Sequence, residues 1–203
     1  MAGTIMLCGA FAQAQNAKLS AAPPVTYANR YELYAGINFL NTQAGQDIPY
    51  RANLGGVEVL GTRWLTRKLG VGAEFRGEAG TTPVIASPIS QSGVTRPLIY
   101  QIWGMGGVEY RGPGNQLAAI NYHAFAGAAH GVFNTQTEAL PFNVGLYSDR
   151  TRPIFALGGS LDLNRSRKIA IRISPDLILE HWGTETRTFF SIGGGLLYRF
   201  GKN

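Results

Sequence analysis

The sequence predicts an all-β protein, an eight-stranded antiparallel up-and-down transmembrane β-barrel. Three observations support this fold class. Apolar and polar residues alternate with a period of two along almost the whole chain after residue 30. Short connections alternate with longer ones between the alternating segments, as in a meander with one plain rim and one elaborate rim. The chain also carries 27 glycines, which disfavour helices and suit closely packed strands.

The N-terminal residues have the character of an export signal. Residues 1–14 combine an apolar stretch with A-x-A-like cleavage sites, so we expect a signal peptide. Because this segment lacks a basic region, we expect the true start to lie a few residues upstream. Cys8, the single cysteine, lies within it, so the exported chain has no disulfide. We expect 15–29 to be a flexible lead-in, 30–200 the barrel and 201–203 a short tail.

Eight segments carry the alternation, and no apolar run reaches the roughly 18 residues that a spanning helix needs. The segments are residues 30–40, 53–64, 69–76, 98–110, 117–128, 153–163, 169–180 and 190–200. One apolar-parity residue from each, in order, is Ile37, Val57, Phe75, Ile102, Ile120, Leu157, Ile171 and Leu196. The matching polar-parity residues are Glu32, Glu58, Arg76, Glu109, Asn121, Asp162, Arg172 and Arg199. Turn-forming residues fill the short connections at 66–68, 111–115 and 164–168.

The distribution of charge indicates which parity faces the membrane. Acidic residues lie only on the polar parity, whose other members are mostly small, as a narrow eight-stranded interior requires. The apolar parity is aliphatic in the middle and aromatic near both ends, which is typical of a lipid-facing belt. The aromatics expected near the plain rim are Tyr31, Tyr110, Tyr198 and Phe200; those expected toward the other rim are Phe39, Phe75, Tyr100, Phe155 and Phe190.

The final strand supports this interpretation. Its apolar face would leave an aggregation-prone edge in a soluble sheet, but not if it pairs with the first strand. Its "GLLYRF" ending, with Gly195, Tyr198 and Phe200, resembles the C-terminal insertion signal of the eight-stranded outer-membrane β-barrel family, which includes the OmpA-type transmembrane domain and the opacity-type surface proteins. Gly201 to Asn203 follow that signal here, a departure from the family pattern.

The resemblance implies a location and partners. A member of this family lies in the outer membrane of a Gram-negative-type bacterium, contacts outer-membrane lipid and lipopolysaccharide, and is inserted by the barrel-assembly machinery with periplasmic chaperones. A non-enzymatic structural or surface-interaction role follows, with no cofactor or metal and an unspecified partner for the surface loops. The net charge of +6 is spread over turns, loops and interior, so we expect no nucleic-acid binding.

Inward-facing charges form the main candidate site, because charges removed from water must be paired. We expect the arginines to pair with the acids and to close the lumen, and Glu32 to be the nearest partner of Arg199. The expected lumen charge network is Glu32, Glu58, Glu74, Arg76, Glu109, Asp162, Arg172, Asp176, Glu180 and Arg199. A narrow ion-conducting pore through the same residues is an alternative to the closed lumen.

Two further alternatives need different chemistry. A lipid A-modifying enzyme requires a histidine base beside a serine and a carboxylate near the outer leaflet. The candidates are His123, His130, His181 and Ser191, although no His-x-Ser pattern occurs. A soluble ligand-binding barrel would turn its apolar face inward. No glycine-rich phosphate loop, dinucleotide fingerprint or metal-ligand spacing is present in the sequence.

Overall fold

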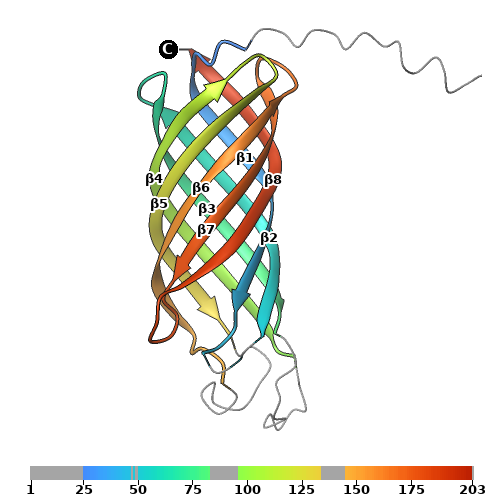
Figure 1. Ribbon diagram of the computed structural model, residues 1–203, viewed down its shortest axis with the longest axis vertical. Helices are drawn as coiled ribbons and strands as arrows, with labels where there is room; N and C mark the ends of the chain where they lie inside the picture. Colours follow the sequence, from blue (N-terminus) through green and yellow to red (C-terminus); the bar gives the residue numbers. More distant parts are fainter. Residues whose placement is uncertain (1–24, 47, 49, 83–95, 134–144, 203) are drawn as a thin grey trace, which may run out of the picture.

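The computed structural model describes residues 25–46, 48, 50–82, 96–133 and 145–202. They form one closed barrel in which every strand is antiparallel to both neighbours, as Figure 1 shows. The strands are β1 Asn29–Gln43, β2 Arg51–Trp64, β3 Leu69–Thr81, β4 Leu98–Gly114, β5 Ala118–Val132, β6 Arg150–Asn164, β7 Ile169–Glu180 and β8 Arg187–Lys202. The predicted fold class is confirmed. Within the described residues, no helical segment could serve as a membrane span.

Side-chain exposure follows the alternation of the sequence. Ile37 and Leu196 are 72% and 62% exposed on the outer surface, whereas Glu58 and Arg172 are 1% and 2% exposed inside. A strand directs successive side chains to opposite faces, so a closed sheet separates them into an outer and an inner set. The outer set is therefore mainly apolar, and the inner set holds most of the charge of the strands.

Pairing of the first and last strands closes the barrel. β1 and β8 run antiparallel with Tyr31 opposite Phe200 and Glu32 opposite Arg199. The Tyr31 and Phe200 rings stack with centroids 5.5 Å apart, and Tyr198 stacks on Phe200 at 5.8 Å. Closure satisfies the backbone groups of both strands without water, which a bilayer core demands. The expected pairing of these two strands is confirmed.

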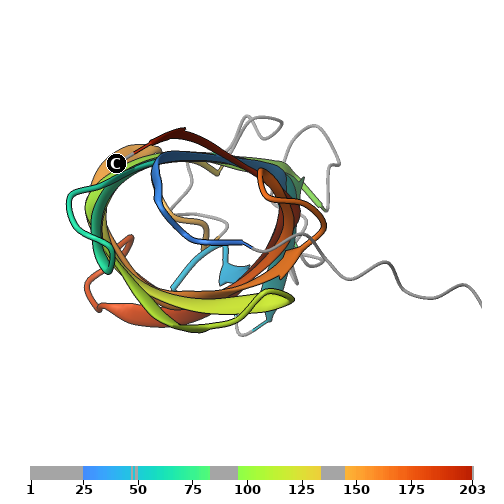
Figure 2. The same cartoon turned by 90° about the horizontal axis from the view of Figure 1, so that it is seen from above.

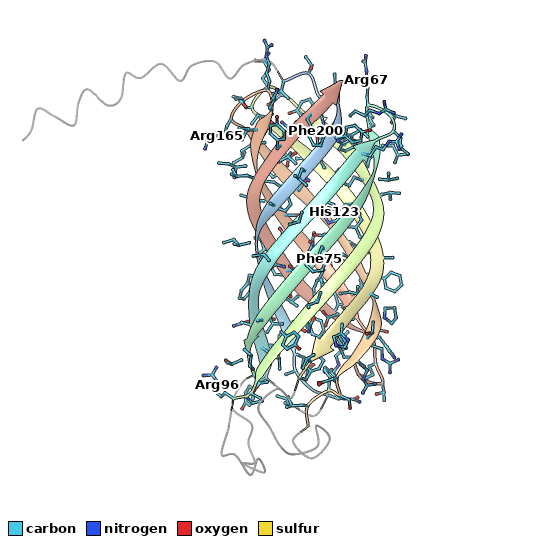
Figure 3. All side chains as sticks on the ribbon, turned by 180° about the vertical axis from the view of Figure 1, so that it is seen from behind. Arg67, Phe75, Arg96, His123, Arg165 and Phe200 are labelled. Atoms are coloured by element: carbon cyan, nitrogen blue, oxygen red, sulfur yellow. The ribbon has the colours of Figure 1, made fainter. Side chains whose placement is uncertain are left out.

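The two ends of the barrel differ. The end at which β1 begins and β8 finishes, here called the terminal end, carries the short connections 65–68, 115–117 and 165–168. Thr66, Asn115 and Ser166 each accept two backbone N–H bonds, which holds these turns. The opposite end, the loop end, joins strands through 44–50, 82–97, 133–149 and 181–186. Figure 3 places Arg67 and Arg165 at the terminal end and Arg96 at the loop end.

One predicted turn is wrong. The sequence suggested a turn over 111–115, but β4 continues to Gly114, with a register irregularity between Arg111 and Gly114. The extension places Arg111 on the inner parity, where its side chain is buried and pairs with Glu32. The glycines and proline that suggested a turn instead accompany the irregularity, and the turn itself lies at 115–117.

The expectation of a mostly small interior is also wrong. Many inward side chains are large, including all three tryptophans, Trp64, Trp103 and Trp182, each no more than 2% exposed. At the loop end, the Phe133 ring packs edge-on against Tyr147 and Trp182, with centroids 5.5 and 5.2 Å away. Further apolar side chains buried inside are Leu40, Leu54, Ile99, Ile154 and Ile178. Packed side chains therefore fill the interior beside the charged groups.

Two predicted segments fall wholly or partly outside the described residues. The predicted signal peptide, residues 1–14, lies wholly outside them. The predicted long loop between β5 and β6 lies partly outside them, because the structure describes only residue 133 and residues 145–149 of this connection. Leu146 and Tyr147 of that stretch are 5% and 6% exposed, and the Phe133 amide donates to Asp149 at 2.8 Å. This end of the connection therefore belongs to the packed loop end of the barrel.

Candidate functional site

The lumen charge network is built by inward positions of seven strands. Burial inside a narrow barrel removes these groups from bulk water, so each needs a partner. The buried acids are Glu32, Glu58, Glu74, Glu78, Glu109, Asp162, Asp176 and Glu180, and the buried arginines are Arg76, Arg111, Arg172 and Arg199. The described interior therefore holds more acids than arginines, and it divides into a central cluster, a terminal-end cluster and three separate acids.

Arg76 organises the central cluster. Its Nε lies 2.7 Å from Glu74 Oε1 and 3.4 Å from Glu58 Oε2, and its Nη2 donates to Asp176. Ser191 Oγ accepts from Nη1 at 3.2 Å. The planar guanidinium thus joins side chains of β2, β3, β7 and β8 across the lumen, which only a narrow barrel permits.

Three further side chains complete this cluster. The Tyr34 hydroxyl donates to Glu58, and His123 Nε2 lies 2.8 Å from Asp176 Oδ1. The His123 ring stacks on Phe125 with centroids 4.9 Å apart. Figure 3 places His123 at about the middle of the barrel's length. Asp176 therefore joins Arg76 to His123 in the centre of the lumen.

Glycines on the inner face make room for these carboxylates. A Cβ at Gly193 would lie 1.9 Å from Glu58 Oε1, and one at Gly158 would lie 2.0 Å from Asp176 Oδ1. Any larger residue would displace the acid from its partners. Gly193 and Gly195 of β8 thus have a packing role, because a Cβ at Gly195 would also lie only 2.2 Å from the Ala35 carbonyl oxygen, whereas a Cβ at Gly194 would meet no atom within 4 Å.

The terminal-end cluster joins three arginines to two acids. Arg172 forks onto Asp162, with Nε–Oδ1 and Nη2–Oδ2 distances of 2.7 and 3.0 Å. Arg199 Nη2 also reaches Asp162 Oδ2 at 3.2 Å. Arg111 Nη2 lies 2.7 Å from Glu32 Oε1. Arg172 and Arg199 approach Glu32 less closely, at 3.4 and 3.5 Å. The expectation that Glu32 is the nearest partner of Arg199 is therefore wrong, because Asp162 lies closer to Arg199.

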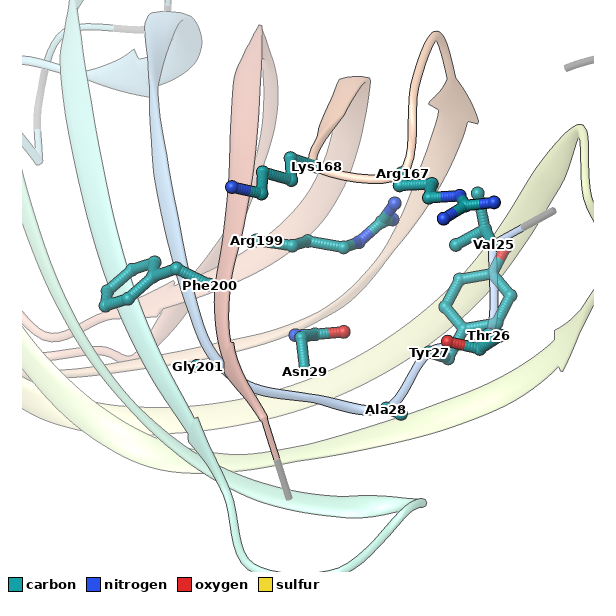
Figure 4. A pocket seen from close by; sticks show the side chains of 10 residues that line it. All are labelled: Val25, Thr26, Tyr27, Ala28, Asn29, Arg167, Lys168, Arg199, Phe200 and Gly201. Atoms are coloured by element: carbon teal, nitrogen blue, oxygen red, sulfur yellow. The ribbon is translucent and has the colours of Figure 1, made fainter. Parts of the chain in front are cut away.

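Tyr27 covers this cluster at the terminal end. Its hydroxyl accepts from Asn164 Nδ2 at 2.7 Å and donates to the Asn115 carbonyl oxygen at 2.7 Å. The guanidinium carbons of Arg111 and Arg199 lie 5.4 and 5.2 Å from the Tyr27 ring centroid. Seen from above, the blue segment that precedes β1 crosses the barrel opening (Figure 2), and Figure 4 shows Arg199 directed toward Tyr27.

Tyr27 lies within residues 15–29, the segment expected to be a flexible lead-in, but its contacts hold it against the barrel. Of residues 15–29, the structure describes 25–29, and Tyr27 adopts a φ of 50°. A non-glycine residue in this left-handed region costs about 1–3 kcal/mol unless its surroundings hold it there. Here the hydroxyl bonds and the two arginines supply that support. The last residues of the lead-in therefore form part of the structure that covers the terminal end of the barrel.

Three buried acids have no ion pair within the described part of the chain. Asn38 Nδ2 donates to Glu78, and Thr62 Oγ1 donates to Glu109. Glu180 Oε2 accepts from Trp182 Nε1 at 2.7 Å and from Thr42 Oγ1 at 3.2 Å. These three acids therefore accept hydrogen bonds from neutral side chains instead of forming ion pairs with arginines.

The structure places all ten predicted network residues inside the barrel but does not join them all. Glu109 and Glu180 bond to neutral side chains, whereas the other eight make ion pairs. Arg111, Glu78, Tyr34 and Tyr27 were missed. Glu78 and Tyr34 share the inner parity of β3 and β1, so the alternation alone could have found them. Arg111 was missed because the glycines and proline that follow it suggested a turn. Tyr27 was missed because it precedes the alternating pattern.

The histidines and the insertion-signal residues occupy separate places. His130 lies on β5 and bonds Thr151, and His181 bonds Thr186 in the β7–β8 connection. Ser191 bonds Arg76, and His123 bonds Asp176, so these two side chains are engaged in the central cluster. Tyr198 and Phe200 face outward at the terminal end, 44% and 43% exposed, while Gly195 packs against β1. Within the described residues, no group of three or more metal-ligating side chains is placed to hold an ion.

Comparison with solved structures identifies the fold. The Neisserial surface protein A structure superposes with a TM-score of 0.60 at 7% sequence identity, covering 84% of this chain and 97% of that chain. The fold is that of the eight-stranded outer-membrane β-barrels. Ail, the attachment invasion locus protein of Yersinia pestis, gives a TM-score of 0.52 at 16% identity, covering 83% of this chain and 98% of that chain. No protein-family model and no curated protein matches the chain.

Energetic coupling of Glu32 to Arg111 should exceed its coupling to Arg199. The Arg111–Glu32 contact is 2.7 Å, whereas the Arg199–Glu32 contact is 3.5 Å and Arg199 has Asp162 and Asn164 as closer partners. In double-mutant cycles, Arg111→Met with Glu32→Leu should give a coupling of about 1–3 kcal/mol, and Arg199→Met with Glu32→Leu about 0.5 kcal/mol. Urea unfolding in one detergent at one pH measures both. Equal couplings, or additivity in the first cycle, would contradict this arrangement.

Proposed function

We propose that the protein is a non-enzymatic outer-membrane barrel with a closed lumen, which carries its loop end at the cell surface. In this proposal the chain is exported by its N-terminal signal and inserted by the barrel-assembly machinery with help from periplasmic chaperones. The terminal end, with its short turns, lies in the periplasm. The loop end contacts lipopolysaccharide and supports a structural or surface-interaction role.

The observation that carries the proposal is the outer surface of the strands. Large apolar side chains stand exposed along every strand, and Ile37, Val57, Phe75, Leu157 and Leu177 each exceed 50% exposure. A soluble protein rarely exposes so large an apolar area. A bilayer covers it, and the closed backbone hydrogen bonding supplies the second requirement of a membrane span.

Surface contact is supported by charge at the loop end. Arg96 lies at the end of the β3–β4 connection (Figure 3), and Arg150 and Arg152 lie in the first residues of β6 at the same end, where lipopolysaccharide phosphates would be within reach. The two structural neighbours are named a surface protein and an attachment invasion locus protein. Those names describe the neighbours, and a surface role for this chain rests on the proposal.

The closed lumen is supported by three successive layers of packing. Tyr27 covers the terminal end, the Arg76 cluster crosses the middle, and Phe133 with Trp182 packs at the loop end. An ion would have to displace paired charges to pass. This arrangement favours the closed lumen over the narrow pore.

Removal of Tyr27 alone should not open the lumen. In planar bilayers we expect neither the parent nor Tyr27→Ala to show stepwise ohmic conductance, because the other two layers remain. Tyr27→Ala should instead lower the free energy of unfolding by about 1–3 kcal/mol, through loss of the hydroxyl's hydrogen bonds and of the cation–π contacts with Arg111 and Arg199. Phe155→Ala, an outward aromatic with no lumen contact, is the control. Steady conductance in either protein would favour the pore.

Fractionation of a Gram-negative host tests the proposed location. The full chain should sediment with outer membranes, resist urea extraction and migrate faster unboiled than boiled on a detergent gel. Phe200→Ala should lower the heat-modifiable fraction more than Phe190→Ala, because only Phe200 lies in the proposed insertion signal. Recovery in the soluble fraction would contradict the proposal. Altered lipid A masses in cells that express the protein would favour the enzyme alternative.

A further inference from the structure

A shallow groove crosses the outer surface of the barrel near the terminal end. It has a volume of about 410 Å³ and lies over β1, β2 and β3, with Phe200 of β8 at its edge. Its floor is formed by Gly61 and Ala73, which are direct neighbours across the β2–β3 pair. Leu33 lies beside Gly61 on the other flank. Two small residues side by side between larger ones thus create the depression.

The walls of the groove are apolar and aromatic. Leu33 and Val71 are 47% and 40% exposed along its sides. The stacked rings of Tyr31 and Phe200 form the wall toward β8. A Cβ at Gly61 would have no atom within 4 Å, so the space above this residue is open to whatever surrounds the barrel.

A positive charge stands at the terminal-end mouth of the groove. Arg63 is exposed, lies opposite Tyr31 and Val71, and follows Gly61 by two residues, about 7 Å along the strand. Among outward-facing strand positions whose side chains are described, Arg51 and Arg63 carry the formal charges, and Arg51 lies at the opposite end of β2. Arg63 forms no ion pair with any described acid. The Arg30 guanidinium adds a second charge, 5.9 Å from the Tyr31 ring centroid.

We infer that this groove binds an anionic phospholipid of the periplasmic leaflet. An acyl chain would lie on Gly61 and Ala73 between Leu33 and Val71, and the headgroup phosphate would meet Arg63 beyond the aromatic wall. The choice of a lipid rests on charge complementarity. Along the membrane normal, the apolar groove comes first and the Arg63 cation lies beyond it, which is the order of the acyl chain and the anionic headgroup in a phospholipid. The inference depends on the proposed membrane-spanning role and adds a specific ligand to it.

Native mass spectrometry of the full chain tests the inference. The detergent-purified protein is offered equimolar phosphatidylglycerol and phosphatidylethanolamine with identical acyl chains. We expect the parent to retain phosphatidylglycerol about fivefold over phosphatidylethanolamine. Arg63→Gln should bring this ratio close to one. Gly61→Leu should lower the retention of both lipids, because the new side chain occupies the groove.

Matched variants separate the groove from general effects. Gly104→Leu fills another outward glycine with open space above it, and Arg67→Gln removes an arginine from the neighbouring turn; both should behave as the parent. If Gly61→Leu does not fold, Ala73→Leu fills the same floor. Heat-modifiable mobility of each variant verifies a folded barrel independently of lipid retention.

Three outcomes would overturn the inference while leaving the proposed location intact. The first is equal retention by the parent, Gly61→Leu and Gly104→Leu, which indicates general contact with the lipid annulus. The second is a parent that shows no preference for the anionic lipid. The third is a dimer mass that Gly61→Leu abolishes, which would assign the groove to a second copy of the chain. Absence of the parent from membranes, by contrast, would refute the proposed function itself.

Discussion

Arg76→Met should destabilise the barrel more than any other single lumen substitution. Arg76 forms ion pairs with Glu58, Glu74 and Asp176, which are all at most 6% exposed. Its removal therefore takes away the guanidinium that these three buried acids share. Breaking a buried ion pair from one side costs about 3–5 kcal/mol, because the remaining charge stays out of water. We expect a loss of this size in the free energy of unfolding.

Urea unfolding in one detergent, followed by tryptophan fluorescence, measures this loss, since all three tryptophans are buried. Arg67→Met is the matched control, because Arg67 lies in the exposed β2–β3 turn and should shift the midpoint little. Arg76→Lys should be intermediate, since an ammonium keeps the charge but not the planar fork. A midpoint for Arg76→Met equal to that of the parent would show that the three acids do not depend on this arginine.

Ile173→Arg should impair insertion, whereas Ile173→Val should be mild. Ile173 is 39% exposed on the outer face of β7, between Leu161 of β6 and Gly194 of β8. An arginine on the lipid face near the bilayer midplane costs about 2–4 kcal/mol. The folded fraction recovered after insertion into liposomes, read from heat-modifiable mobility, measures the effect.

A second pair of variants tests whether the effect comes from lipid contact. Arg172, one residue earlier, points into the lumen, so Arg172→Met should act through Asp162 and show its loss in detergent as well. Ile173→Arg should be far less harmful in detergent micelles, where the side chain can reach water. Full insertion of Ile173→Arg into liposomes would mean that the outer face of β7 does not meet the hydrocarbon core.

Alternation along each strand made the fold and the orientation of side chains predictable. Glu58, Arg172 and Arg199 face inward because they share the polar parity, and Ile37 and Leu196 face outward because they share the other. Parity is local, since each residue's direction follows from the strand geometry of its own neighbours. The pairing of β1 with β8 followed too, because an exposed apolar edge strand is unfavourable.

Local sequence was misleading in two places. Arg111 stands before a glycine, a proline and another glycine, which are turn-forming in isolation, yet its pairing with Glu32 belongs to the extended end of β4. The inner face was expected to be small, although Trp64 and Trp103 were visible on the polar parity. Ring packing against arginines explains their place inside: the Arg111 guanidinium carbon lies 3.8 Å from the Trp64 ring centroid.

A closed eight-stranded barrel, with charge inside and apolar surface outside, follows from the order of residues along the chain. Which charges meet is settled by the folded barrel: Arg76 of β3 with Asp176 of β7, and Glu32 with Arg111 more closely than with Arg199. The position of Tyr27 across the terminal end is likewise known only from the folded structure. The physical reason is that contacts across a lumen depend on the accumulated stagger of all eight strands. A shift of two residues in one register keeps every side chain on its face but moves its partner by about 7 Å.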